Sequence, residues 1–175
     1  RQPNPCLREK VVVVMAGDHG VVREGVSAYP QEVTPQMVAN FLNGGAAINV
    51  LSRHVGARVV IVDMGVAFDM PAHPNLLLKK IAYGTQNICA GPAMTRQQAE
   101  QAILTGAAVV EAEIARGLDV LATGDMGIGN TTPSAAIAAV VTGRAACEFV
   151  GRGTGLDDEG LNRKVSAVER ALLVN

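Results

Sequence analysis

The sequence predicts an α/β fold, a Rossmann-like open and mostly parallel sheet with helices on both faces. Short apolar runs at 11–16, 58–64 and 119–123 each end just before a glycine, which is typical of buried parallel strands. Segments with helical spacing separate these runs, and strands that alternate with helices imply parallel crossover connections. Because hydrophobic residues make up 49% of the chain and aromatic residues only 3%, small aliphatic side chains must fill the core. We expect residues 1–175 to form a single nucleotide-binding α/β domain.

Cap residues place the first expected helix. Thr34 followed by Pro35 predicts an N-cap and a first helical residue. Apolar residues then recur near helical spacing up to Leu51, and Gly56 fits a C-cap. Two adjacent glycines within 43–45 predict a break in this helix or the close approach of another element.

Similar features place three more helices. Thr95 opens a capping-box sequence, which predicts a helix to about residue 116. Another helix is expected to have Pro133 at its first position, and a last one to cover about 159–175. The stretch 66–93 carries several turn residues and is expected to be a longer excursion, in which 76–81 forms either a strand or a short helix.

Composition excludes several classes of protein. The formal net charge is −1, and without a basic stripe or aromatic platform a nucleic-acid partner is not expected. The apolar runs are too short for a membrane span, and no secretory signal is visible. The cysteines Cys6, Cys89 and Cys147 form no CxxC pair, so we expect neither a zinc site nor a disulfide framework, and a cytoplasmic protein. The histidines are too scattered for a metal site.

The most specific segment is 124–134, which reads GDMGIGNTTPS. Gly127 and Gly129 remove side chains from a turn between a strand and a helix, so backbone amides can face one point at the positive end of that helix. Thr131 and Thr132 add hydroxyl donors, as does Ser134. This pattern predicts an anion site, most naturally for a phosphate; the alternative is a tight turn with a capped helix and no ligand.

Two other groups are weaker candidates. The glycine cluster at 151–155 is followed by Lys164, and glycines with a cation would complete a phosphate cradle; the alternative is a flexible loop. Asp18 and His19 follow the first strand and form either an acid/base pair or a loop cap. Because a Walker motif and a dinucleotide fingerprint in its proper context are both missing, ATP and NAD are disfavoured. Phosphoribosyl diphosphate is disfavoured too.

Five ordered segments carry a resemblance to a known family. They read VVVVMAGDHGV, GVSAYPQEVTPQMVANFLNGGAAINVL, GTQNICAGPAM, GDMGIGNTTPSAA and GRGTGLDDEGL. In this order they resemble the nicotinate-nucleotide:dimethylbenzimidazole phosphoribosyltransferases over nearly the whole chain. The resemblance implies transfer of phosphoribose from nicotinate mononucleotide to 5,6-dimethylbenzimidazole, which yields α-ribazole 5'-phosphate and nicotinate in cobalamin lower-ligand assembly. It also implies a homodimer and no cofactor or metal, because the donor already carries a cationic leaving group.

The resemblance implies roles for particular residues. Asp125 would support the oxocarbenium-like transition state, although the family commonly has Glu at this position. The donor's phosphate and ribose would be held by Gly127, Gly129, Asn130, Thr131, Gly153, Thr154 and Lys164. The pocket for the aromatic base would be lined by Ser27, Tyr29 and Gln36.

The resemblance also implies that this chain is a fragment of a longer enzyme. The family's general base is a glutamate near the carboxyl end, which we expect to lie beyond Asn175, and most of the small helical domain would be missing. We therefore expect donor binding without turnover from this chain alone. Two alternatives remain, a binding module that never turns over and a relative that uses another aromatic acceptor.

Overall fold

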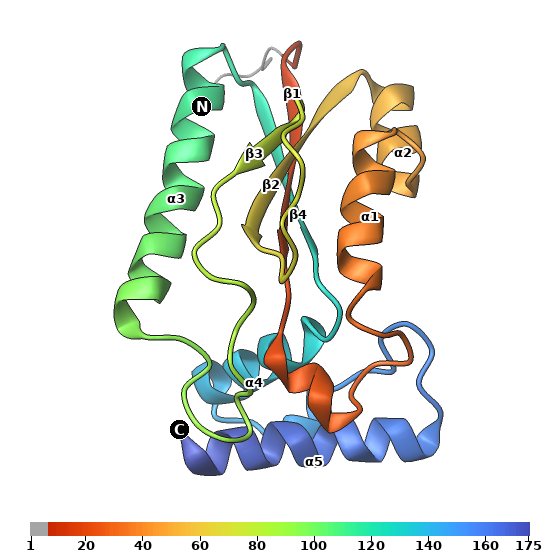
Figure 1. Ribbon diagram of the computed structural model, residues 1–175, viewed down its shortest axis with the longest axis vertical. Coiled ribbons are helices and arrows are strands. Elements are labelled where there is room, and N and C mark those ends of the chain that lie inside the picture. The colour runs from red at the N-terminus through yellow and green to blue at the C-terminus, as the bar shows by residue number, and fades with distance from the viewer. Residues whose placement is uncertain (1–6) are drawn as a thin grey trace.

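A computed structural model describes residues 7–175 and shows a four-stranded sheet with the strand order β3-β2-β1-β4 (Figure 1). Each neighbouring pair of strands is parallel, so the predicted α/β class is confirmed. The predicted strands are present with slightly wider bounds, and the ambiguous segment near residue 76 supplies a short edge strand. The strands are β1 (Lys10–Gly17), β2 (Ala57–Gly65), β3 (Leu76–Leu78) and β4 (Val120–Met126).

The helices cover both faces of this sheet and its lower end. In Figure 1, α1 (Val33–Leu42) and α2 (Ala47–Val55) lie on one side of the strands and α3 (Arg96–Ala115) lies on the other. The helices α4 (Thr131–Thr142) and α5 (Asp158–Val174) lie beneath the carboxyl ends of the strands. Two 3-10 turns, η1 (Gly20–Glu24) and η2 (Ala146–Glu148), complete the described elements. None of the helices described here is long and apolar enough to span a membrane.

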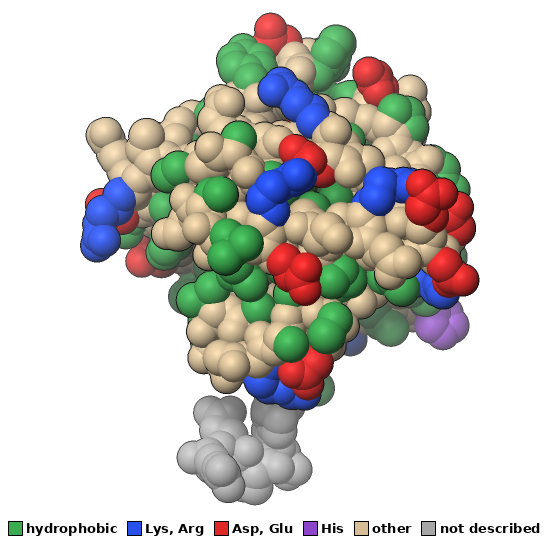
Figure 2. Space-filling view, turned by 90° about the horizontal axis from the view of Figure 1, so that it is seen from below, with side chains coloured by type: hydrophobic (Ala, Val, Ile, Leu, Met, Phe, Trp, Pro, Cys, Tyr) green, Lys and Arg blue, Asp and Glu red, His purple; other side chains and the backbone are tan. Residues whose placement is uncertain are grey.

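The end of the molecule that α5 crosses carries charges of both signs. Figure 2 views this end from below and shows basic and acidic side chains interspersed, with no large area of one sign. Basic side chains of α5 form ion pairs, Arg163 with Glu159 and Arg170 with Glu24. A continuous basic surface for a polyanion is therefore not present on this face.

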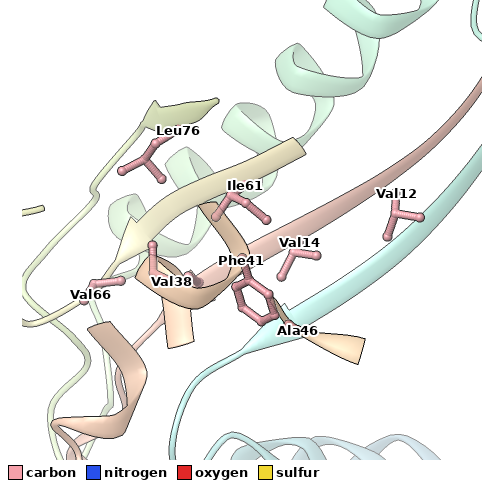
Figure 3. Packing of buried hydrophobic residues seen from close by; sticks show 9 residues of the cluster. Val12, Val14, Val38, Phe41, Ala46, Ile61, Val66 and Leu76 are labelled. Carbon is pink, nitrogen blue, oxygen red and sulfur yellow. The ribbon is translucent and has the colours of Figure 1, made fainter. Parts of the chain in front are cut away.

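The core is built from aliphatic side chains on both faces of β1. Val12, Val14 and Ala16 face α1, where Phe41 and Val38 pack against them (Figure 3). The alternate side chains Val11 and Val13 point the other way and pack near Val109 of α3. Two-sided burial explains why this strand reads as a continuous apolar run without polar alternation. It also fixes the register, and hence which residues emerge at the carboxyl ends.

Several predicted helix boundaries hold. Thr95 and Gln98 form the expected capping box, with the Gln98 amide donating to Thr95 Oγ1 at 3.1 Å. Gly56 ends α2 with a φ of 68° in the left-handed region, as a C-cap glycine does. The break at 43–45 is confirmed, since it separates α1 from α2. A Cβ on Gly45 would lie 2.4 Å from Asn40 Oδ1, so a larger residue there would displace the Asn40 side chain.

The positions expected for Thr34 and Pro133 at the starts of two helices are wrong. Thr34 is not a cap, because α1 begins at Val33 and the Thr34 amide already donates to the Gln31 carbonyl. Likewise α4 begins at Thr131 after Asn130, which places Pro133 at the third helical position rather than the first. In both cases the preceding turn winds directly into the helix. Of the cysteines, Cys89 is buried and free, Cys147 is exposed and free, and Cys6 lies outside the described residues.

Candidate functional site

The carboxyl ends of β1 and β4 meet in direct backbone contact. A Cβ on Gly127 would lie 1.9 Å from the Gly17 carbonyl oxygen and 3.1 Å from the His19 ring. Because backbone atoms cannot move aside, only glycine allows this approach. The turn after β4 is thereby pressed against the turn after β1, at the edge of an open parallel sheet where ligands usually bind.

The turn from Gly127 to Thr131 leads into α4 and leaves backbone donors unused. Gly129 has a φ of +86°, and a Cβ there would lie 2.8 Å from Val22 Cγ2. The amides of Asn130 and Thr132 donate to carbonyls within the turn, and the Ile128 amide donates to Thr34 Oγ1 at 3.0 Å. The amides of Gly129 and Thr131 have no partner within residues 7–175. Alternate amides at a helix start are thus available to an anion.

Lys164 brings a buried cation to the same helix start. Lys164 is only 1% exposed. Its Nζ donates hydrogen bonds to Thr131 Oγ1 at 2.6 Å and to the Gly151 carbonyl at 3.0 Å. Burial lowers the pKa of this ammonium below its ordinary value. Two of its three protons are used, and Nζ lies 3.5 Å from where a Cβ on Gly153 would be. The remaining donor is held between the two glycine segments.

These segments enclose a pocket of about 150 Å³. Its walls combine the turn after β4, the glycine loop before α5 and the residues that follow η1. Lys164 at its base and Asp125 at its rim are its two charged side chains. The lining residues are Val26, Ser27, Asp125, Met126, Gly127, Ile128, Gly129, Asn130, Thr131, Gly153, Thr154 and Lys164.

Four of the residues expected at the site do not line this pocket, and one of them, Ser134, donates its hydroxyl to the Asn130 carbonyl at 2.9 Å instead. Thr132 is fully buried, and its hydroxyl has no hydrogen-bond partner within residues 7–175. Tyr29 is 50% exposed and Gln36 is exposed; they lie between η1 and the first turns of α1. Ser27 does line the pocket, and its hydroxyl accepts from the Tyr29 amide at 3.2 Å. The structure therefore groups the residues expected to hold the phosphoribosyl donor, whereas Tyr29 and Gln36, two of the three expected to contact the aromatic base, lie on the surface.

Asp125 lies near the end of β4 with an exposed carboxylate. It accepts a hydrogen bond from the side-chain amide of Asn130, the residue that precedes α4. This contact holds the carboxylate beside the turn without burying it. A negative charge at the rim and a positive charge at the base suit a ligand that carries both an anionic phosphate and a developing cation.

Asp18 and His19 behave as the loop cap rather than as part of this pocket. Asp18 is 2% exposed, and its Oδ2 accepts from the Ala67 amide at 2.8 Å, which ties the ends of β1 and β2 together. Burial lowers the pKa of His19, against the opposing effect of the Asp18 and Asp125 charges. Both residues instead border a separate, mostly apolar cavity of about 180 Å³ beside α3.

Two features of this region have no signal in the local sequence. Thr34 reaches the glycine turn through its hydroxyl, which no local pattern indicates. The ion pair between the buried Asp63 and the partly buried Lys80, at 2.9 Å, lies near the end of β2 and outside the pocket lining. Within the described part of the chain no group of side chains is arranged to hold a metal ion.

Comparisons with known proteins are consistent with this geometry. The model of a family described as "Phosphoribosyltransferase" matches residues 1–175. The nicotinate-nucleotide–dimethylbenzimidazole phosphoribosyltransferase of Roseiflexus sp. (strain RS-1) is 58% identical over 171 residues, which cover 98% of this chain and 48% of that protein. The protein of the same name from Dehalococcoides mccartyi is 53% identical over 171 residues, covering 98% of this chain and 49% of that protein.

A solved structure is similar over the same extent. The crystal structure of CobT from Thermus thermophilus matches with a TM-score of 0.93 at 54% identity, and the match covers 97% of this chain and 51% of that chain. The present chain thus spans about half the length of the relatives that it matches.

Proposed function

Because the chain belongs to the phosphoribosyltransferase family whose model matches residues 1–175, we propose that it forms the donor-binding part of a nicotinate-nucleotide:dimethylbenzimidazole phosphoribosyltransferase. The proposed reaction moves phosphoribose from nicotinate mononucleotide to 5,6-dimethylbenzimidazole and gives α-ribazole 5'-phosphate and nicotinate. The observation that carries the proposal is the buried ammonium of Lys164 beneath the unpartnered amides of Gly129 and Thr131.

The donor phosphate would occupy the base of this pocket. The free amides, the positive end of α4 and the third proton of Lys164 all favour an anion at one point. Gly153 and Thr154 close the opposite wall. No bulky side chain stands between these groups, since Gly127 and Gly129 remain glycine for steric reasons given above.

The ribose and the breaking bond would then lie toward Asp125. The bond between the anomeric carbon and the pyridinium nitrogen breaks with its electron pair moving onto the ring, which leaves as nicotinate. Positive charge develops on the sugar, and the Asp125 carboxylate at the rim stabilises it. Donation from Asn130 Nδ2 fixes the carboxylate's position. The acceptor nitrogen forms the new bond, and its ring N–H must lose a proton to a general base.

A second function, donor binding without turnover, is favoured by one observation. Asp125 is the only carboxylate among the residues that line the pocket in the described chain, and it is assigned to the sugar. No second carboxylate lines this pocket within the described residues to take the proton from the acceptor. We expect little or no nicotinate release from the 175-residue chain with dimethylbenzimidazole present, because a general base contributes about 10²- to 10⁴-fold. Near-full activity would contradict this expectation.

The acceptor, the assembly and the compartment belong to the same proposal. Ser27 would contact the aromatic base from the pocket, and Tyr29 and Gln36 would approach it from the exposed segment before α1. Another aromatic acceptor remains an alternative within this reaction type. The active enzyme would be a cytoplasmic homodimer without a nucleic-acid partner. Exposed apolar side chains on α4, namely Ile137, Val140 and Val141, provide surface that further polypeptide would cover.

Isothermal titration calorimetry tests the donor site directly. Nicotinate mononucleotide is titrated into the chain, and nicotinate riboside, which lacks the phosphate, serves as the matched control ligand. We expect the phosphate to tighten binding by at least about 10-fold, which corresponds to one charge-assisted hydrogen bond or more. Equal affinity for the two ligands would contradict the proposed site.

A further inference from the structure

Thr34 connects the start of α1 to the glycine turn that lies 94 residues later in the sequence. Thr34 is 0% exposed, and its Oγ1 accepts a hydrogen bond from the Ile128 amide at 3.0 Å. Ile128 is itself buried, and its amide has no other acceptor among the described residues. A buried amide without a partner is disfavoured, so this hydroxyl satisfies a donor of the turn that no carbonyl among the described residues accepts.

The bond determines which amides of the turn remain available. The amides of Ile128, Asn130 and Thr132 are all used within the protein, whereas those between them are not. The Asn130 and Thr132 bonds are local and come with the turn, but the Ile128 bond comes from another element. The Ile128 amide bonds to Thr34 of α1, whereas Gly129 and Thr131, whose amides are not used within residues 7–175, both line the pocket. The anion site is therefore preformed.

Thr34 also belongs to the segment expected to meet the aromatic acceptor. It lies between Ser27, which lines the pocket, and Gln36. A rearrangement of this segment moves the hydroxyl that holds the turn. We propose that Thr34 is a positioning residue, whose hydroxyl holds the glycine turn in its phosphate-binding conformation and couples it to the acceptor segment. The identity of the ligand in this inference rests on the proposed function. The role of Thr34 in holding the turn does not.

Three variants separate the hydroxyl from the methyl group and from a general loss of packing. Thr34→Val keeps the shape and removes the acceptor, whereas Thr34→Ser keeps the acceptor and removes the methyl. Ser52→Ala is the matched control, because it removes a buried hydroxyl of α2 that has no partner. The first readout is hydrogen exchange of the Ile128 amide, measured by NMR without ligand. The second is the dissociation constant of nicotinate mononucleotide.

In Thr34→Val we expect exchange at Ile128 to accelerate about 10-fold or more, because the amide loses its partner. The dissociation constant should rise about 5- to 10-fold, the effect of losing one hydrogen bond that preorganises the site. Thr34→Ser should remain within about twofold of the unmodified chain in both readouts, and Ser52→Ala should do so too.

Unchanged protection of Ile128 in Thr34→Val would overturn the inference, and so would equal damage from Thr34→Ser, which would assign the effect to packing. Faster exchange in Thr34→Val with unchanged donor affinity would also overturn it. If the unmodified chain does not bind nicotinate mononucleotide, the proposed function fails by itself. The Ile128 exchange rates and the affinity for inorganic phosphate then decide whether Thr34 positions an anion site.

Discussion

Two turns at the carboxyl end of the sheet look alike in sequence and differ in structure. Gly17-Asp18-His19-Gly20 begins at the last residue of β1, whereas Gly124-Asp125-Met126-Gly127 begins within β4 and ends just after it. In the sheet, however, Met126 pairs with Ala16 and Asp125 pairs with Met15. The two aspartates are therefore not equivalent. Asp18 follows its strand and is buried as a cap, whereas Asp125 is still within its strand and remains exposed at the pocket rim.

This difference shows that the register of the strand, and not the short motif, determines whether the aspartate is buried or exposed at the pocket. The glycine that corresponds in space to Gly17 is Gly127, since the two are in backbone contact. The first turn uses its polar groups to join β1 to β2, through the Asp18 amide to Gly65 and the Ala67 amide to Asp18. The second turn leaves two amides free and begins a helix. One turn is structural, and the other has the free donors that a binding site needs.

The largest expected effect comes from the contact between the two turns. Gly127→Ala places a Cβ 1.9 Å from a backbone oxygen, so the strand ends must separate. We expect the free energy of unfolding to fall by more than about 3 kcal/mol, as measured by urea denaturation. Gly106→Ala is the control, because nothing lies within 4 Å of its Cβ position in α3. This change should be neutral or stabilise by about 0.5–1 kcal/mol. Similar losses in both variants would argue against the contact.

The next effect concerns ligand binding by the second turn. Lys164→Ala should weaken nicotinate mononucleotide binding by about 1–3 kcal/mol, since a charge-assisted hydrogen bond is lost at the base of the pocket. Arg163→Ala removes a neighbouring cation that pairs with Glu159 at the surface, and it should change the affinity by less than about 0.5 kcal/mol. Calorimetry on both variants checks the contrast. Unchanged affinity in Lys164→Ala would show that the ammonium does not meet the donor.

A smaller effect should separate the two aspartates by stability. Asp18→Ala removes the acceptor of the Ala67 amide and should reduce the free energy of unfolding by about 1–2 kcal/mol. Asp125→Ala removes an exposed carboxylate and should reduce it by less than about 0.5 kcal/mol. Chemical denaturation of the two variants gives the comparison. A larger loss from Asp125→Ala would mean that its bond to Asn130 is structural.

The smallest expected effect is a pH dependence from the first turn. Burial lowers the pKa of His19 in the folded protein, so the unfolded chain binds a proton first as the pH falls. The corresponding stability is fully present above the ordinary histidine pKa of about 6.5 and is lost as the pH falls below it. We expect His19→Gln to flatten the fall in unfolding free energy between about pH 7.5 and 5.5. Urea denaturation at several pH values checks this, and an unchanged slope in His19→Gln would contradict it.

Much of the fold was predictable from local pattern. The apolar runs indicated three strands, because both faces of the sheet are covered and strands of that kind lack polar alternation. Caps at Thr95 and Gly56 also held, since cap chemistry is local. The edge strand β3 remained ambiguous because it has only three residues. The start of α1 was misplaced because Thr34 has a partner on another element, and no local rule reports such a partner.

The candidate site divides in the same way. The glycine turn was identified from its own residues. The burial of Lys164 could be predicted from helical periodicity. Lys164 occurs with Ala167, Val168 and Ala171 on the buried face of α5, and a lysine on an apolar helical stripe indicates a buried charge. Thr132 lies on the same stripe of α4 as the buried Ala135, Ala136 and Ala139. The sequence did not show this, because the larger apolar residues Ile137, Val140 and Val141 mark the other, exposed face of the helix. The exposure of Tyr29 and Gln36 depends on tertiary structure around an irregular segment.

The central claim is that the turn after β4, and not the turn after β1, binds the donor phosphate through free amides. The most direct test is NMR titration of the 175-residue chain with nicotinate mononucleotide, followed at each backbone amide. We expect the largest amide shifts at Gly129 and Thr131, with residues 17–20 shifting far less. Shifts centred on residues 17–20, or none at Gly129 and Thr131 at saturating ligand, would contradict the claim.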